Sequence, residues 1–155
     1  MDRLWTAPEK NPLANRTVLM AVQPLWLDTL IKAIQEEGGH PLPVNNEEEV
    51  FSCLQFEQPE FFILSEGLGR EGSQSASLLE YIQKMPAGQR REIFVVWVGR
   101  NVKPGDMLSA FSYSVNLVLQ PEQLPEMTRL MKKSWSQWKD LYQVFLQTRL
   151  QLAGT

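Results

Sequence analysis

The sequence predicts a doubly wound α/β fold, a five-stranded parallel sheet with helices on both faces and an extended helix at the C-terminus. Three strongly apolar runs, at residues 18–22, 61–64 and 93–98, are typical of buried strands, and a shorter run follows at 117–119. Segments with helical periodicity separate these runs. This alternation predicts parallel strands joined by right-handed crossovers.

The first half of the chain supports this order of elements. Residues 1–15 are interpreted as a leader, with Trp5 as the side chain that can pack onto the domain. The first strand is followed by an amphipathic helix with the apolar stripe Leu27, Leu30, Ile31 and Ile34, and Gly38-Gly39 is expected to end it.

A weak strand at residues 42–44 is flanked by Pro41 and Pro43. Proline restricts a strand to the edge of a sheet, so this strand is placed at the side. An edge position for the second strand fits the flavodoxin-like strand order 2-1-3-4-5.

The second half contributes the remaining helices. Asn46 is expected to cap a helix whose first turn, Glu47-Glu48-Glu49, suits the helix dipole. Ser75 is expected to cap the next helix, and residues 86–91 are interpreted as a polar link. A short helix is expected over about 104–111, before the strand at 117–119 and the long terminal helix.

Composition bounds the possible functions. A chain of 155 residues fits one domain with a sizeable core. Its net charge of −3 provides no electrostatic footprint for nucleic acid, so nucleic-acid binding is not expected. One cysteine and one histidine make a metal cluster or a Cys-His nucleophile pair improbable. No membrane span, cofactor or metal is expected, and a cytoplasmic location is the default.

Four segments together resemble the receiver domain of two-component response regulators. They are Thr17-Val-Leu-Met-Ala-Val-Gln-Pro, Pro59-Glu-Phe-Phe-Ile-Leu-Ser, Ile93-Phe-Val-Val-Trp-Val-Gly and Leu117-Val-Leu-Gln-Pro-Glu-Gln-Leu. The resemblance covers about residues 16–134. It implies a CheY-like fold for this domain and leaves residues 135–155 as a helical extension.

The resemblance also implies a phosphorylation pocket, and this chain departs from it at every position. Receivers hold Mg²⁺ with acids after the first strand, accept phosphoryl on an Asp after the third, and use Thr or Ser after the fourth and Lys after the fifth. The positions here hold Val22 and Gln23, Ser65, Val98 and Gln120. Mg²⁺ prefers carboxylate oxygens, which Val22 and Gln23 lack, and serine cannot form an acyl phosphate. We therefore expect a pseudo-receiver that has lost phosphotransfer, unless a one-residue slip places Glu66 at the acceptor position.

Residues 67–72 spell a literal G-x-G-x-x-G, with glycines at Gly67, Gly69 and Gly72. In dinucleotide-binding proteins this motif lets a pyrophosphate approach a helix N-terminus, but there it follows the first strand of the fold. Here it follows the third strand, so a variable loop is the favoured interpretation.

The terminal helix has a seven-residue apolar repeat: Leu124, Met131, Trp138, Phe145 and Leu152. Such a repeat predicts a long helix with one apolar seam. Residues 135–155 either fold back on the domain or project to meet a partner.

Two functions follow. The first is a non-catalytic signalling module that acts by protein–protein interaction or homodimerisation, through a surface that includes Tyr113, Leu124, Met131, Trp138 and Phe145. The alternative is sensing of a nucleotide or neutral ligand at the strand ends, with Glu66, Gly67, Gly69 and Gly72 as ligand-binding residues. No nucleophile–base pair is evident, so we expect no enzyme.

Overall fold

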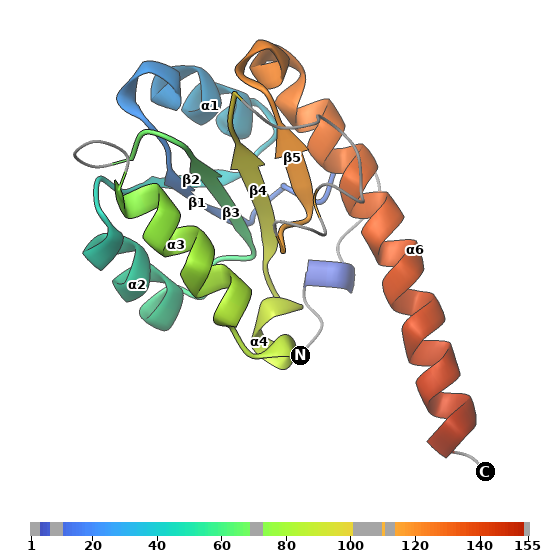
Figure 1. Cartoon of the computed structure of the whole chain (residues 1–155). Helices are drawn as coiled ribbons and strands as arrows, with labels where there is room; N and C mark the ends of the chain where they lie inside the picture. Colours follow the sequence, from blue (N-terminus) through green and yellow to red (C-terminus); the bar gives the residue numbers. More distant parts are fainter. Residues whose placement is uncertain (1–3, 7–10, 69–72, 101–109, 111–113, 154–155) are drawn as a thin grey trace.

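A five-stranded parallel sheet forms the centre of the computed structural model, which describes residues 4–6, 11–68, 73–100, 110 and 114–153 (Figure 1). The strand order is β2-β1-β3-β4-β5. The strands are β1 (Thr17–Ala21), β2 (His40–Pro43), β3 (Phe61–Ser65), β4 (Phe94–Val98) and β5 (Leu117–Leu119). Every neighbouring pair is parallel, which confirms the predicted order. The predicted second strand begins too late, because His40 pairs with Thr17.

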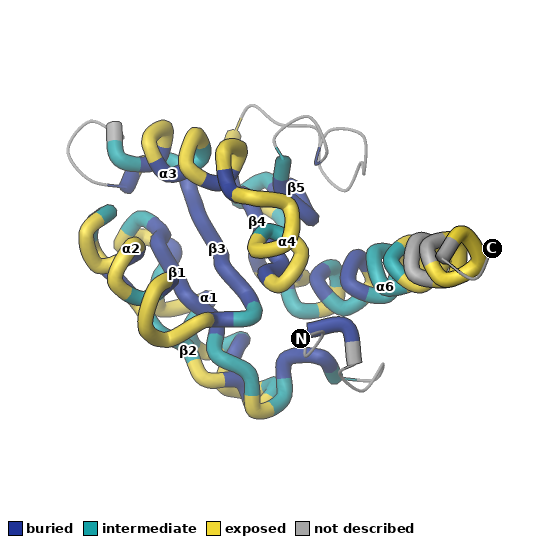
Figure 2. The backbone as a smooth tube through the Cα atoms, turned by 90° about the horizontal axis from the view of Figure 1, so that it is seen from below, coloured by how far each residue is buried: buried dark blue, intermediate teal, exposed yellow. Residues whose placement is uncertain are grey.

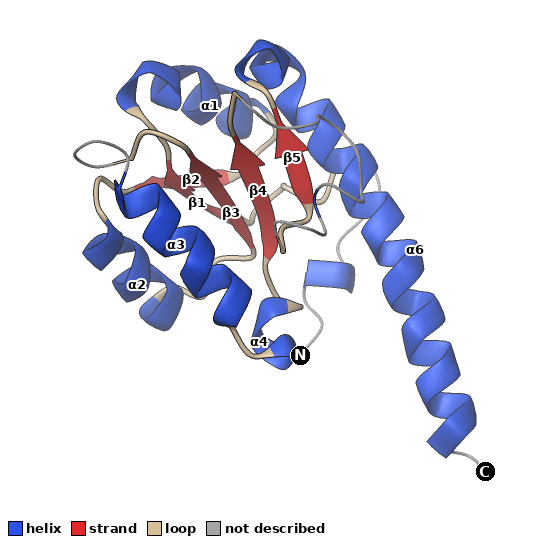
Figure 3. Cartoon of the chain, viewed as in Figure 1, coloured by secondary structure: helices blue, strands red, loops and turns tan. Residues whose placement is uncertain are grey.

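Helices cover both faces of the sheet (Figure 3). On one face lie α1 (Pro24–Glu36) and α6 (Met127–Ala153), and on the other lie α2 (Glu47–Phe56) and α3 (Ser73–Lys84). A 3-10 turn, η3 (Pro121–Glu126), precedes α6, so Leu124 lies outside the α-helix. The expected helix at 104–111 lies outside the described residues apart from Ala110.

The predicted helix ends are partly confirmed. Gly38 (φ +77°) ends α1, and the N–H of Gly39 donates to the carbonyl of Ile34 at 3.0 Å, as in a Schellman motif. Asn46 caps α2, because its Oδ1 accepts the N–H of Glu49 at 2.9 Å. The prediction for Ser75 is wrong: this residue lies inside α3, which begins at Ser73.

Residues 86–91, which were interpreted as a polar link, contain a helical turn, α4 (Ala87–Arg90). Pro86 stands at the N-cap, and the N–H of Arg90 donates to its carbonyl at 2.9 Å. A turn of four residues is too short to show helical periodicity, so only the tertiary contacts of Arg90 reveal why it forms.

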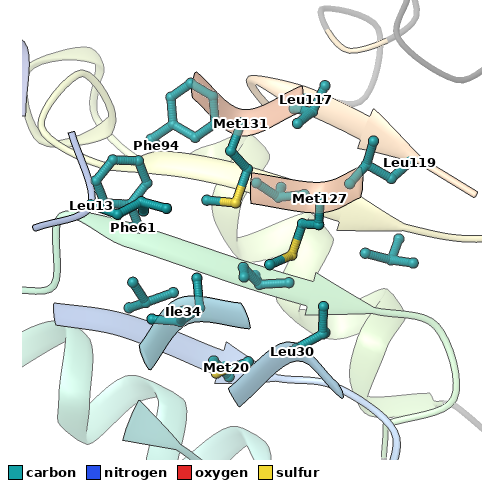
Figure 4. Close-up of a cluster of buried hydrophobic side chains, with 14 of the residues drawn as sticks. Leu13, Met20, Leu30, Ile34, Phe61, Phe94, Leu117, Leu119, Met127 and Met131 are labelled. Atoms are coloured by element: carbon teal, nitrogen blue, oxygen red, sulfur yellow. The ribbon is translucent and has the colours of Figure 1, made fainter. Parts of the chain in front are cut away.

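The strands are the most deeply buried part of the chain (Figure 2), and two clusters of apolar side chains pack against the two faces of the sheet. Strand residues on one face pack against α1 and the first half of α6, with Leu30, Ile34, Met127 and Met131 pointing at the strands (Figure 4). Alternate strand residues face α2 and α3. Because β3 and β4 are covered on both sides, all of their residues are buried.

The N-terminal segment packs against this core. Leu4, Trp5 and Leu13 are buried, and the indole of Trp5 donates to the carbonyl of Arg91 at 2.7 Å. Trp135 on α6 in turn donates to the carbonyl of Leu4 at 3.1 Å. The packing expected of Trp5 is thus confirmed. The division of the chain at residues 15 and 134 stays a prediction.

Helix α6 begins on the sheet and ends beyond it (Figures 1 and 2). Met127, Met131 and Trp135 have no exposed surface, whereas Leu152 is 72% exposed. We call residues 141–153 the distal segment, because its described apolar side chains are largely exposed. Both outcomes considered for the terminal helix therefore occur, one in each half. No helix among the described residues is long and apolar enough to cross a membrane.

Candidate functional site

The carboxyl ends of β1, β3, β4 and β5 lie side by side at one edge of the sheet, where parallel α/β folds bind ligands. They bring together the five residues that the resemblance to receivers predicted at phosphorylation positions. Val22 and Gln23 follow β1, Ser65 and Val98 end β3 and β4, and Gln120 follows β5.

Ser65 is at the centre of a closed hydrogen-bond arrangement, which we call the strand-end lock. Its hydroxyl accepts the N–H of Gln23 and donates to the carbonyl of Glu66, both at 2.9 Å. The Gln23 side-chain amide donates to the same carbonyl at 3.2 Å. Ser65 is fully buried, so these bonds replace water around its hydroxyl.

Ser75 continues the lock from α3. Its hydroxyl donates to the carbonyl of Ser65 at 2.7 Å and accepts the N–H of Leu68 at 3.0 Å. This is the role that replaces the predicted helix cap. The serine joins the end of β3, the following loop and α3 through one side chain.

Gly67 lies directly against the lock. Its φ of +81° belongs to the left-handed region, and a Cβ there would lie 3.0 Å from the side-chain nitrogen of Gln23. The geometry accounts for glycine at this position without a bound phosphate. Gly69 and Gly72 lie outside the described residues.

The other two positions add no charge. Val98 is fully buried, and its carbonyl accepts the N–H of Glu66 at 3.0 Å. Gln120 caps η3, and its N–H donates to Gln123 Oε1 at 2.9 Å. These side chains serve the fold, and neither supplies a cation to pair with a transferred phosphoryl group.

Glu66 is an acid that directly follows β3 at this edge. Its carboxylate lies 3.8 Å from Nε of Arg100, whose guanidinium stacks 5.7 Å from the Trp26 ring centroid. The Arg100 side chain is largely exposed and that of Glu66 partly so, and such a pair contributes at most about 1 kcal/mol. Among the described residues, no three His, Cys, Asp or Glu side chains gather into a metal site.

A second feature lies at the opposite end of the sheet, where β4 and β5 begin. An apolar groove of about 420 Å³ runs between α6 and the segments before these strands. Its lining includes Trp5, Val115, Trp138, Leu141 and Tyr142. The Trp5 and Tyr142 rings stack with centroids 5.7 Å apart.

Arg90 forms the polar wall of this groove. Its guanidinium donates to the carbonyl of Ser114 at 2.9 Å, the carbonyl of Ile93 at 2.7 Å and Asn116 Oδ1 at 2.9 Å. Burial lowers the pKa of Arg90 to about 10. The indole of Trp138 donates to the carbonyl of Asn116 at 2.7 Å, which ties α6 to the same segment. Sequence reasoning missed the groove, because its walls come from segments far apart in the chain.

The structure describes three of the side chains that were expected on an interaction surface: Leu124, Met131 and Trp138. Leu124 and Met131 are buried against the sheet, with exposed fractions of 5% and 0%, so a partner cannot reach them. Trp138 is half-buried in the groove wall. Tyr113 and the side chain of Phe145 lie outside the described residues. The apolar side chains in the first half of the seam are buried in the domain's own core.

Solved receiver structures share this fold. A response regulator from Thermotoga maritima is 18% identical with a TM-score of 0.60, and a receiver domain from Francisella is 12% identical with 0.61. Each match covers 79% of this chain and 98% of the other.

A fusion protein carrying a yeast trimeric coiled-coil segment is 13% identical with a TM-score of 0.60, over 92% of this chain and 91% of that chain. No protein-family model and no curated protein matches the sequence. The chain therefore has the receiver fold. At these low sequence identities, the matches are evidence for the fold alone.

Proposed function

We propose that this chain is a receiver-like regulatory module that acts through protein–protein contacts and works without phosphorylation of an aspartate. The observation that carries this proposal is the strand-end lock. The residue that the resemblance aligns with the phosphorylated aspartate is Ser65, and its hydroxyl is neutral, buried and hydrogen-bonded.

Phosphoryl transfer would need groups that this edge does not offer. A divalent cation needs several oxygen ligands, and the residues after β1 are Val22 and Gln23. The main-chain N–H of Gln23 and its side chain are already engaged by Ser65 and Glu66. A neutral residue, Gln120, stands where charge would have to be balanced.

The exposed end of α6 supports the part of the proposal that concerns protein contacts. Leu141, Val144, Leu150 and Leu152 expose between 51% and 72% of their surface. Large apolar side chains exposed on a projecting helix favour a contact with another protein surface.

The alternative of ligand sensing at the strand ends has less support. A ligand there would have to displace the bonds among Gln23, Ser65 and Glu66, and each broken bond leaves a buried polar group to be satisfied again.

The test is incubation with acetyl phosphate and Mg²⁺, followed by intact-mass measurement. We expect no added phosphoryl group on the wild type. The Ser65→Ala and Glu66→Gln variants are the matched probes, because they remove the two candidate acceptors singly. An acid-labile phosphoryl adduct that disappears with Glu66→Gln would establish the slipped register and overturn phosphorylation independence.

A further inference from the structure

We propose that the chain self-associates as an antiparallel, two-fold pair of α6 helices, in which the tip of each helix enters the groove of the other copy. This inference rests on the proposed function and names the partner that the exposed helix serves. The occupant of the groove is thus the end of the distal segment of a second copy.

Tyr142, at the start of the distal segment, stacks on Trp5, and beyond it the helix projects from the body of the protein (Figures 1 and 2). Most of the stability of helices in proteins comes from packing of an apolar face, so a projecting helical segment gains from a packing surface. Leu141 and Leu152 are 51% and 72% exposed. These leucines would supply that surface.

The exposed leucines share a face with the groove. Leu152 follows Leu141 by eleven residues, about three helical turns, so the two side chains point in nearly the same direction. Trp138 lies about four turns before Leu152, and both Trp138 and Leu141 line the groove. Gln143, Gln147 and Gln151 occupy another face of the same helix.

Helix α6 therefore borders the groove at Trp138 and carries the exposed Leu152 near its C-terminal end. These two positions are about 21 Å apart along the helix axis. In an antiparallel pair, each Leu152 reaches the base of the other helix and each groove is filled. In a parallel pair, both tips meet and both grooves stay open. The antiparallel arrangement closes on itself by a two-fold axis, and the opposed helix dipoles favour it.

Charge favours a second copy over an unlike partner. The distal segment has one charged residue, Arg149, whereas residues 127–140 have five: Arg129, Lys132, Lys133, Lys139 and Asp140. Like charges across a homotypic interface repel, and a nearly neutral segment avoids that cost. An unlike partner would be expected to use complementary charges for recognition. Because each groove takes up only the tip of one helix, we expect weak association, with dissociation in the micromolar range.

Light scattering across a concentration series tests the association. We expect the wild type to approach twice the 17.8 kDa chain mass, and Leu152→Glu to remain monomeric. Gln147→Glu is the matched control: it places the same charge on an exposed residue of another face and should still dimerise. Circular dichroism checks that each variant is folded. We expect Leu152→Glu to be folded because this side chain is 72% exposed.

Disulfide trapping tests the orientation in a Cys53→Ser background, which removes the natural thiol. Chains with Leu152→Cys mixed with chains carrying Leu141→Cys should form a mixed disulfide. Leu152→Cys alone should not crosslink, because its two thiols would lie about 16 Å apart along the helix axis. Efficient crosslinking of Leu152→Cys with itself overturns the antiparallel pair.

A wild type that stays monomeric at high micromolar concentration overturns self-association, and the groove then serves a different protein or an apolar small molecule. A trimer overturns the two-fold arrangement. Neither result affects the phosphoryl-transfer test, which reads the intact mass of the chain. Failure of this inference can thus be distinguished from failure of the proposed function.

Discussion

Trp135 is the residue through which the first half of α6 joins the core. It is fully buried, its indole donates to the carbonyl of Leu4 at 3.1 Å, and its ring stacks on Trp5 with centroids 6.3 Å apart. The perturbation we select is Trp135→Ala, which removes the largest fully buried side chain and leaves that carbonyl without its donor.

Truncation of a buried tryptophan to alanine costs about 3–5 kcal/mol. For a domain of this size, each kcal/mol lowers the melting temperature by about 2–4 °C, so we expect a decrease of about 6–20 °C. Trp135→Phe keeps most of the ring and loses the hydrogen bond, and should cost about 1–2 kcal/mol.

The assay is urea unfolding followed by far-UV circular dichroism, at one protein concentration for all variants that lies below the expected self-association of α6. Leu152→Ala is the matched control on the same helix, and because its side chain is 72% exposed we expect a change within about 0.5 kcal/mol. Equal, small effects at both positions would refute the division of α6 into a buried half and an exposed half.

Three further predictions test the local geometry. Gly67→Ala should destabilise by about 1–2 kcal/mol because of its φ of +81°, while Gly88→Ala, whose Cβ would meet no atom nearer than 3.9 Å, should be neutral in the same denaturation assay. Arg90→Met should cost about 3 kcal/mol or more, measured by thermal unfolding, because it leaves buried carbonyl oxygens without a donor. Burial, and then the carboxylates of Glu57 and Glu49, raise the pKa of the Cys53 thiol above 9.0, so iodoacetamide should modify the folded protein more slowly than the urea-unfolded chain. Because the folded pKa is the higher one, this thiol's contribution to stability is complete below the unfolded pKa and is lost as the pH rises through the folded pKa, and a pH series of unfolding experiments that shows no such decline would contradict the assignment.

The strand pattern could be predicted because burial leaves a local trace. Strands that are covered on both faces, such as β4, appear in the sequence as uninterrupted apolar runs. The prolines on either side of Leu42 indicate an edge strand. The cap at Asn46 was also predictable, because its partner, the N–H of Glu49, is three residues away.

The sequence indicated which positions make up the candidate site, but it did not indicate how their side chains are hydrogen-bonded. Sequence spacing placed Gln23 and Ser65 at neighbouring strand ends. It did not reveal that their hydrogen bond closes the site, nor that Ser75 would reach back from α3 to the carbonyl of Ser65. Such bonds join residues 10 and 42 positions apart, for which no periodicity exists.

The sequence by itself determined the order of the strands, the apolar face of the first helix and the neutral residues that follow β1 and β5, because each is encoded by the residue types present. Only the tertiary structure decided how α6 is divided and where the apolar groove lies. The seven-residue repeat is the same at Met131 and Leu152, yet one is buried and the other exposed. The difference arises because the sheet ends in space before the helix does, and a local repeat contains no information about that distance.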